Sequence, residues 1–189
     1  MIIKEDEIWL IANNEFLTEK HFNQFNFNDC RVIHFNAANH ISYFKDYNNT
    51  LILNNFTGWG GGFHGYPKIL FIYKDFKEIG FSLQTAQLND DAFSKHIKEI
   101  SNLCPTFILN SDEVWDTFKL GHVPSIGYIT LRFLINNYPN KKINLLGFTG
   151  GYTINDKIYG FGHSWDIEQK YIRESKVNSY FNSLELLKH

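Results

Sequence analysis

Short apolar runs and stretches of helical periodicity alternate along the first half of the chain. Residues 8–12 and 31–35 are rich in large apolar side chains over the length of one strand, which is typical of strands buried on both faces of a sheet. Between them, apolar side chains from Leu17 to Phe25 repeat at helical spacing. Further strands are predicted at residues 50–54, 69–73, 106–109 and 143–146. This alternation indicates parallel strands joined by helices.

Helical patterns dominate the second half. Amphipathic helices are expected at residues 91–103 and 111–120. A Pro-Ser-x-Gly turn at residues 124–127 opens a third helix, whose apolar side chains recur at helical spacing. Asp166 is expected to cap a fourth helix, with Gln169 in the capping-box position. From there the pattern predicts helix to the end of the chain.

The pattern as a whole predicts one Rossmann-like α/β domain covering residues 1–189, with a mostly parallel sheet and helices on both of its faces. A chain of 189 residues is long enough to bury a substantial core in a single domain. Ligands in open sheets of this kind bind beyond the carboxyl ends of the strands. The loops that follow the strands are therefore the expected place of a binding site.

Composition and charge narrow the classes of function. The formal net charge is −2 and the sequence has no basic patch, which argues against nucleic acid as a partner. The N-terminus is charged within a few residues, and no apolar stretch of leader or membrane-spanning type follows it. Neither a secretory leader nor a transmembrane segment is therefore expected, and peripheral membrane association stays open. Cys30 and Cys104 match no metal-binding spacing, and the cytoplasm is the expected location.

The turn at residues 124–127 suits an anion. Ser125 is a good N-cap, and the first turn of a helix leaves backbone N–H groups unpaired beside a partial positive charge. Gly127 has no side chain, so an anion can approach the backbone closely there and at the neighbouring Ile126. The turn predicts a site for phosphate or carboxylate, with an ordinary helix start as the alternative.

A titratable pair follows in the loop and first turn of the next helix. His163 and Glu168 are five positions apart, so they do not share one helical face and act together only if the loop folds back. Each has a plainer interpretation, His163 as a surface histidine and Glu168 as a favourable charge at a helix N-terminus.

Asparagines follow the first two predicted strands. Asn13 comes directly after residues 8–12, and Asn36 directly after residues 31–35. An asparagine amide both donates and accepts hydrogen bonds, which suits ribose hydroxyls, phosphate or base edges. Asparagine also favours turns for local reasons, and that alternative stays open.

A glycine-rich segment, residues 57–67, is predicted to be a loop. It is not a dinucleotide-binding turn, because a proline and a predicted strand follow it instead of a helix. Trp59 and His64 make it a possible substrate loop that covers a ligand, with a plain connector as the alternative. His122 precedes the anion turn and is a further candidate contact, although His64, His122 and His163 have no zinc spacing.

Together these segments resemble the sialyltransferases, the glycosyltransferases that carry sialylmotifs. Residues 124–127, Pro-Ser-Ile-Gly, resemble the small sialylmotif, normally Pro-Ser-Thr-Gly. His163-Ser-Trp-Asp resembles the third motif, and His163 with Glu168 fits the very small motif, His-x4-Glu. Residues 10–14 and 31–38 follow the large sialylmotif in the same order. The departures are Ala12 for Gly, His34 for Arg, Ile126 for Thr, and one histidine that serves two motifs.

The resemblance implies a bacterial soluble relative that transfers a sialic-acid-type sugar from a CMP-activated donor to a hydroxyl of a glycan acceptor. It implies that His163 is the general base and that Glu168 supports it. It also implies that Asn13, Asn36 and residues 125–127 contact the donor nucleotide. No metal is expected, because CMP is a good leaving group with one phosphate and an Asp-x-Asp motif is missing from the sequence. No cofactor is expected besides the donor substrate. Two alternatives remain open: a transferase that uses CMP-Kdo, and a non-catalytic domain that binds a nucleotide or glycan.

Overall fold

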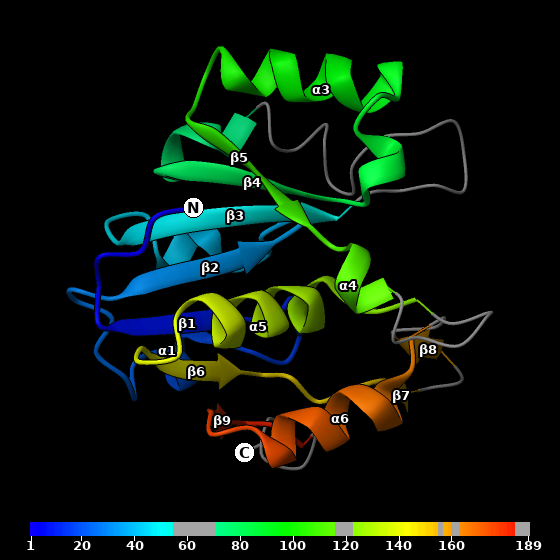
Figure 1. Ribbon diagram of the computed structural model, residues 1–189. Helices are drawn as coiled ribbons and strands as arrows, with labels where there is room; N and C mark the ends of the chain where they lie inside the picture. The colour runs from blue at the N-terminus through cyan, green and yellow to red at the C-terminus, as the bar shows by residue number, and fades with distance from the viewer. Residues whose placement is uncertain (55–70, 116–122, 155–156, 160–162, 184–189) are drawn as a thin grey trace.

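The computed structural model describes residues 1–54, 71–115, 123–154, 157–159 and 163–183 (Figure 1). Within them a seven-stranded sheet has the order β5-β4-β3-β2-β1-β6-β9, and every pairing in it is parallel. The strands are β1 Glu7–Ile11, β2 Arg31–Phe35, β3 Asn48–Asn54, β4 Glu78–Leu83, β5 Thr106–Asn110, β6 Lys142–Leu146 and β9 Asn178–Tyr180. The predicted Rossmann-like α/β fold is confirmed.

The order of the strands creates one topological switch point. The chain adds β2 to β5 one after another on one side of β1 and then returns to place β6 on the other side. The order therefore reverses between β1 and β6, which pair along their whole length from Glu7 opposite Lys142 to Ile11 opposite Leu146. In open parallel sheets the crevice at the carboxyl ends of two such strands is where ligands bind.

Helices cover both faces of the sheet. They are α1 Glu19–Phe22, α3 Asp91–Ser101, α4 Asp112–Trp115, α5 Ile126–Asn137 and α6 Trp165–Glu174, with 3-10 turns at Ile41–Tyr43, Tyr73–Asp75 and Thr85–Gln87. Side chains alternate along β1, so that Trp9 and Ile11 join one apolar cluster while Ile8 and Leu10 join the other. Helices α1 and α3 contribute to the first cluster, and α5 and α6 to the second, in front of the sheet in Figure 1.

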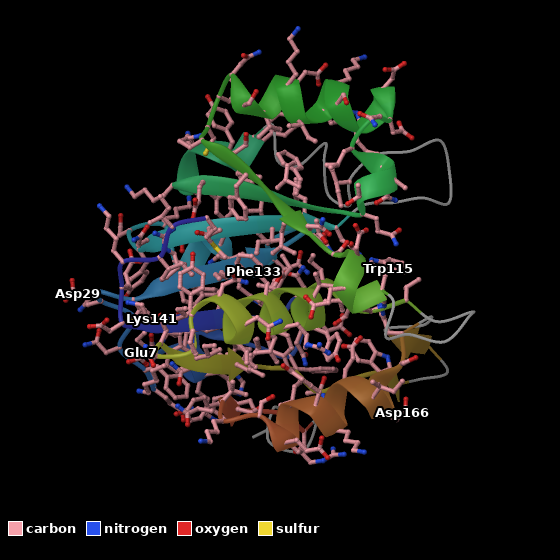
Figure 2. All side chains as sticks on the ribbon, viewed as in Figure 1. Glu7, Asp29, Trp115, Phe133, Lys141 and Asp166 are labelled. Atoms are coloured by element: carbon pink, nitrogen blue, oxygen red, sulfur yellow. The ribbon has the colours of Figure 1, made fainter. Side chains whose placement is uncertain are left out.

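The two ends of the sheet carry different groups. In Figure 2, Asp166 and Trp115 lie at the carboxyl end of the strands, whereas Glu7, Asp29 and Lys141 lie at the amino end.

None of the helices in the described residues is long and apolar enough to cross a membrane.

The strand predicted at residues 69–73 is wrong for the part that the structure describes, since residues 71–75 form helical turns. The strand is β4 instead. Its apolar pattern is interrupted by Gly80, and the ring of Phe107 fills the space that a larger side chain would need. A Cβ at Gly80 would lie 2.3 Å from the Cζ atom of Phe107. The apolar side chain that covers Gly80 belongs to the neighbouring strand, β5. The sequence of β4 alone therefore lacks the continuous apolar run that is typical of a buried strand.

The prediction of helix to the end of the chain is also wrong. Helix α6 ends at Glu174 and β9 then adds a strand beside β6. Tyr180 of β9 stacks on Trp9 of β1, with 5.6 Å between the ring centroids, and this packing favours the strand over a continued helix. A two-stranded antiparallel hairpin, β7 Tyr152–Ile154 and β8 Lys157–Tyr159, precedes α6 and was not predicted. Residues 184–189 lie outside the described residues.

Candidate functional site

A cavity of about 300 Å³ opens at the carboxyl ends of β1 and β6, at the switch point of the sheet. The loop after β6 and the first turns of α5 and α6 complete its wall. The predicted site residues that the structure describes all line it: Asn13, Asn36, Ser125, Ile126, Gly127, His163 and Glu168. Trp59, His64 and His122 lie outside the described residues. Segments from both ends of the chain thus meet in one cavity.

Ser125 is the N-cap of α5, as predicted. Its backbone is extended, with φ −69° and ψ 153°, and its Oγ accepts a hydrogen bond from the N–H of Tyr128 at 3.2 Å. This bond pairs one of the N–H groups that the first turn of a helix leaves without an intrahelical partner.

A buried carboxylate already contacts this helix start. The N–H of Ser125 donates to Oε1 of Glu168 at 2.7 Å, and the Oγ–H of Ser125 donates to Oε2 at 2.6 Å. Glu168 is 2% exposed although it lines the cavity. The two bonds form a bidentate contact between α6 and α5, called the Ser125–Glu168 contact below.

Burial changes the acidity of Glu168. Removal of the carboxylate from water disfavours its charged form and raises the pKa of Glu168 from 4.5 to about 7. The two hydrogen bonds from Ser125 act in the opposite direction, because they stabilise the charged form, but they do not outweigh burial. The site therefore holds a carboxyl group that exchanges its proton near neutral pH.

We predict that Glu168→Gln changes the pH dependence of stability. The folded protein holds the Glu168 proton more tightly than the unfolded chain does, so this stabilisation is complete below pH 4.5 and is lost as pH rises through about 7. The loss corresponds to about 3 kcal/mol. The glutamine amide of the variant does not titrate, so the variant lacks this loss. The free energy of unfolding of the variant minus that of the native chain should therefore be larger at pH 8 than at pH 5. Urea unfolding at both pH values measures this difference.

Glu174→Gln is the matched control for that experiment. Glu174 lies in the same helix but pairs with Lys170 at the surface, with 3.9 Å between the charged atoms and both side chains largely exposed. Its replacement should leave the difference between pH 5 and pH 8 unchanged. If Glu168→Gln shifted stability equally at both pH values, Glu168 would not titrate near neutrality.

The ring of His163 has a defined tautomer when it is neutral. Its Nδ1 lies 2.8 Å from the carbonyl oxygen of Val123, and because a carbonyl only accepts, Nδ1 carries the proton. The Nε2 atom is then left with a lone pair. Trp165 packs edge-on against the ring, with 5.0 Å between centroids. His163 is thus held in one orientation with a proton-accepting atom on its other side.

His163 and Glu168 are both joined to the segment that leads into α5. A bridge joins Val123 to His163, and the Ser125–Glu168 contact follows it. The predicted cap of α6 is wrong: Ser164 is the N-cap and Asp166 lies in the first turn. The predicted capping-box partner, Gln169, instead donates to the carbonyl oxygen of Phe148 at 3.0 Å, which ties α6 to the loop after β6.

The two predicted asparagines hold the strand ends together. Nδ2 of Asn13 donates to the carbonyl oxygen of Phe35 at 2.6 Å, and its Oδ1 accepts from the N–H of Asn39. Asn36 has a left-handed backbone, with φ 48°, and its Oδ1 accepts from the N–H of Asn54 at 2.9 Å. Asparagine tolerates this conformation better than most residues. Both side chains therefore have structural roles and still line the cavity.

Two features of the site were not predicted. Asn14 is buried, and its Nδ2 lies 3.2 Å from the carbonyl oxygen of Gly147 and 3.1 Å from Oγ1 of Thr149, so it joins the loops after β1 and β6. The pair of asparagines after the first strand was the signal available in the sequence.

Gly127 leaves room for a neighbour: a Cβ there would lie 2.4 Å from Cε1 of Phe148. The prediction that an anion uses the space of the missing side chain is therefore wrong, because the Phe148 ring fills it.

No family model, curated protein or solved structure matches this chain. Among the described residues no group of three His, Cys, Asp or Glu side chains is placed to hold a metal ion. The groups that the site offers are a helix start, a tethered imidazole and a buried carboxyl.

Proposed function

We propose that this protein is a glycosyltransferase that moves a sialic-acid-type sugar from a CMP-activated donor to a hydroxyl of a glycan acceptor. One observation carries the proposal: a histidine of defined tautomer and the N-terminus of a helix line the same cavity at the switch point of a parallel sheet. The first group suits proton removal and the second suits a phosphate.

The groups of the site fit the steps of such a transfer. The phosphate of the donor would lie against the first turn of α5, where Ile126 and Gly127 line the cavity. The acceptor oxygen forms a bond to the anomeric carbon while the bond from that carbon to the phosphate oxygen breaks. The proton of the acceptor hydroxyl passes to Nε2 of His163, and CMP leaves with the bonding electrons. The helix N-terminus stabilises the charge on the leaving phosphate.

The remaining groups would bind the nucleoside. Asn13 and Asn36 lie at the ends of β1 and β2, beside the helix start in the same cavity. Among the described residues no partner is found for Nδ2 of Asn36, which leaves a donor for a ribose or base oxygen. The reaction proposed uses no divalent metal, because a single phosphate is the leaving group. A donor that carries Kdo in place of sialic acid would present the same CMP group to these residues.

Nucleotide preference tests the proposal. A ligand that binds only the folded state raises the melting temperature, so CMP should raise it more than UMP, AMP or UDP at equal concentration. Asn36→Asp keeps the Oδ acceptor for Asn54 and a side chain that tolerates positive φ, but it removes the Nδ2 donor. It should reduce the CMP shift. The shift is read by differential scanning fluorimetry at fixed pH.

Two further outcomes would contradict the proposal, one for the nucleotide and one for the catalytic activity. Larger stabilisation by UDP or AMP than by CMP would overturn the CMP-sugar assignment. Stabilisation by CMP without release of CMP from CMP-sialic acid or CMP-Kdo, in the presence of glycan acceptors, would leave a nucleotide-binding domain in place of an enzyme.

A further inference from the structure

The N-terminus of α5 already holds an anion that belongs to the protein. Both oxygens of the Glu168 carboxylate are bound by donors of Ser125, at 2.7 and 2.6 Å. The carboxylate is 2% exposed, so water does not screen it well. Both donors belong to the N-cap residue, so the Glu168 carboxylate lies at the start of α5 before any ligand arrives.

A phosphate entering the cavity would meet this charge. Ile126 and Gly127 follow Ser125 in the first turn of α5 and line the same cavity as Glu168. A phosphate bound by their N–H groups therefore shares one helix end with the Glu168 carboxylate. When these two negative charges lie close together, each raises the pKa of the other. The group with the higher pKa then takes up a proton.

Few charged groups are available to compensate the second negative charge. Among the described residues that line the cavity, His163 is the titratable one besides Glu168, and the loops after β1, β2 and β6 contribute amides, a hydroxyl and apolar groups. On the adjoining faces of α5 and α6, Arg132 donates to the hydroxyl of Tyr128 at 3.1 Å and lies 4.9 Å from the ring centroid of Tyr171. The other ionisable group in the first turn of α6 is Asp166.

We propose that binding of a phosphate group at the start of α5 is coupled to the uptake of one proton by Glu168. This inference rests on the proposed function, because it uses the phosphate of the donor. A dianionic phosphate, the Glu168 carboxylate and one proton from water give a complex with a neutral carboxyl group. That group still accepts from the N–H of Ser125 with one oxygen, and its O–H becomes a donor for the phosphate or for Oγ of Ser125.

The acidity of the free protein supports this coupling. Burial raises the pKa of Glu168 to about 7, so the proton is taken up near neutral pH at little cost. The affinity for the phosphate ligand should then fall about tenfold for each pH unit above 7 and level off below it. Release of CMP after transfer would return the proton to water.

Calorimetric titration of the full chain with CMP tests the proposal. At pH 8, where a phosphate monoester is a dianion, titrations in two buffers of different ionisation enthalpy give the number of protons taken up per bound CMP. We expect about one for the native chain and about zero for Glu168→Gln. The Kd of Glu168→Gln should also be nearly independent of pH between 7.5 and 8.5, whereas that of the native chain rises about tenfold.

Other outcomes assign the proton elsewhere. Uptake that persists in Glu168→Gln and disappears in His163→Asn would place the proton on His163 and overturn the proposal, as would binding of CMP by the native chain without uptake. Inorganic phosphate is titrated in parallel. If it binds with uptake of a proton at Glu168 while CMP does not bind, the nucleotide assignment fails and the coupling stands. If neither ligand binds, both fail.

Discussion

Replacing His163 by alanine is expected to lower the turnover of a CMP-activated sugar about a hundredfold or more, with the fold intact. The change removes the Nε2 lone pair that accepts the acceptor proton in the proposed reaction. His163 lines the cavity, and its side chain makes one hydrogen bond among the described residues, from Nδ1 to Val123, so the loss of the ring should cost little stability. Release of CMP from the donor with saturating acceptor measures the turnover, and thermal melting measures the fold.

His163→Asn separates the base from the tether. The Asn amide N–H₂ occupies nearly the same position as Nδ1 of the imidazole, so it can still donate to the carbonyl oxygen of Val123. It has no proton-accepting atom equivalent to Nε2. If His163 is the base, the asparagine variant should be as inactive as the alanine variant. Recovery of turnover in His163→Asn would show that the residue acts by holding the loop.

The parts of the fold that could be predicted are those whose burial shows in their own residues. β1, β2 and β6 are buried on both faces, and their apolar runs made them recognisable. β4 was missed because Gly80 takes its cover from Phe107, which belongs to the next strand along the chain and is not part of the local pattern. β9 was missed because its three residues are only partly buried or exposed and its stacking partner, Trp9, lies at the other end of the chain.

The same distinction applies to the site. A serine N-cap depends on neighbours within one helical turn, so Ser125 could be assigned from its own segment. The Ser125–Glu168 contact joins residues 43 positions apart, and no local pattern predicts that a carboxylate from the next helix occupies the start of α5. Gly127 illustrates a third case: the missing side chain was noticed, but the group that uses the space, Phe148, becomes visible only in the packed structure.

Replacing Arg31 by methionine is expected to destabilise the protein by about 3 kcal/mol or more. Arg31 begins β2 at the amino end of the sheet and is 7% exposed. Its guanidinium contacts Glu5 at 3.3 Å and Glu78 at 2.7 Å, and it donates to Oγ1 of Thr50 at 2.9 Å. Without it two poorly solvated carboxylates are left close together with no cation between them. Urea unfolding at pH 7 measures the loss.

Two companion variants sharpen this test. Lys170→Met removes the cation of an exposed pair with Glu174 and should change stability by less than about 1 kcal/mol. The triple variant Arg31→Met, Glu5→Gln, Glu78→Gln removes the stranded charges as well and should recover most of the lost stability, since the cost arises from unpaired charge. Because Arg31 and Asn36 lie at opposite ends of β2, binding of CMP by the folded Arg31→Met protein should be unchanged. If Arg31→Met lowered the free energy of unfolding by less than about 1 kcal/mol, as Lys170→Met should, water would screen the charges of Arg31, Glu5 and Glu78 as it screens a surface pair.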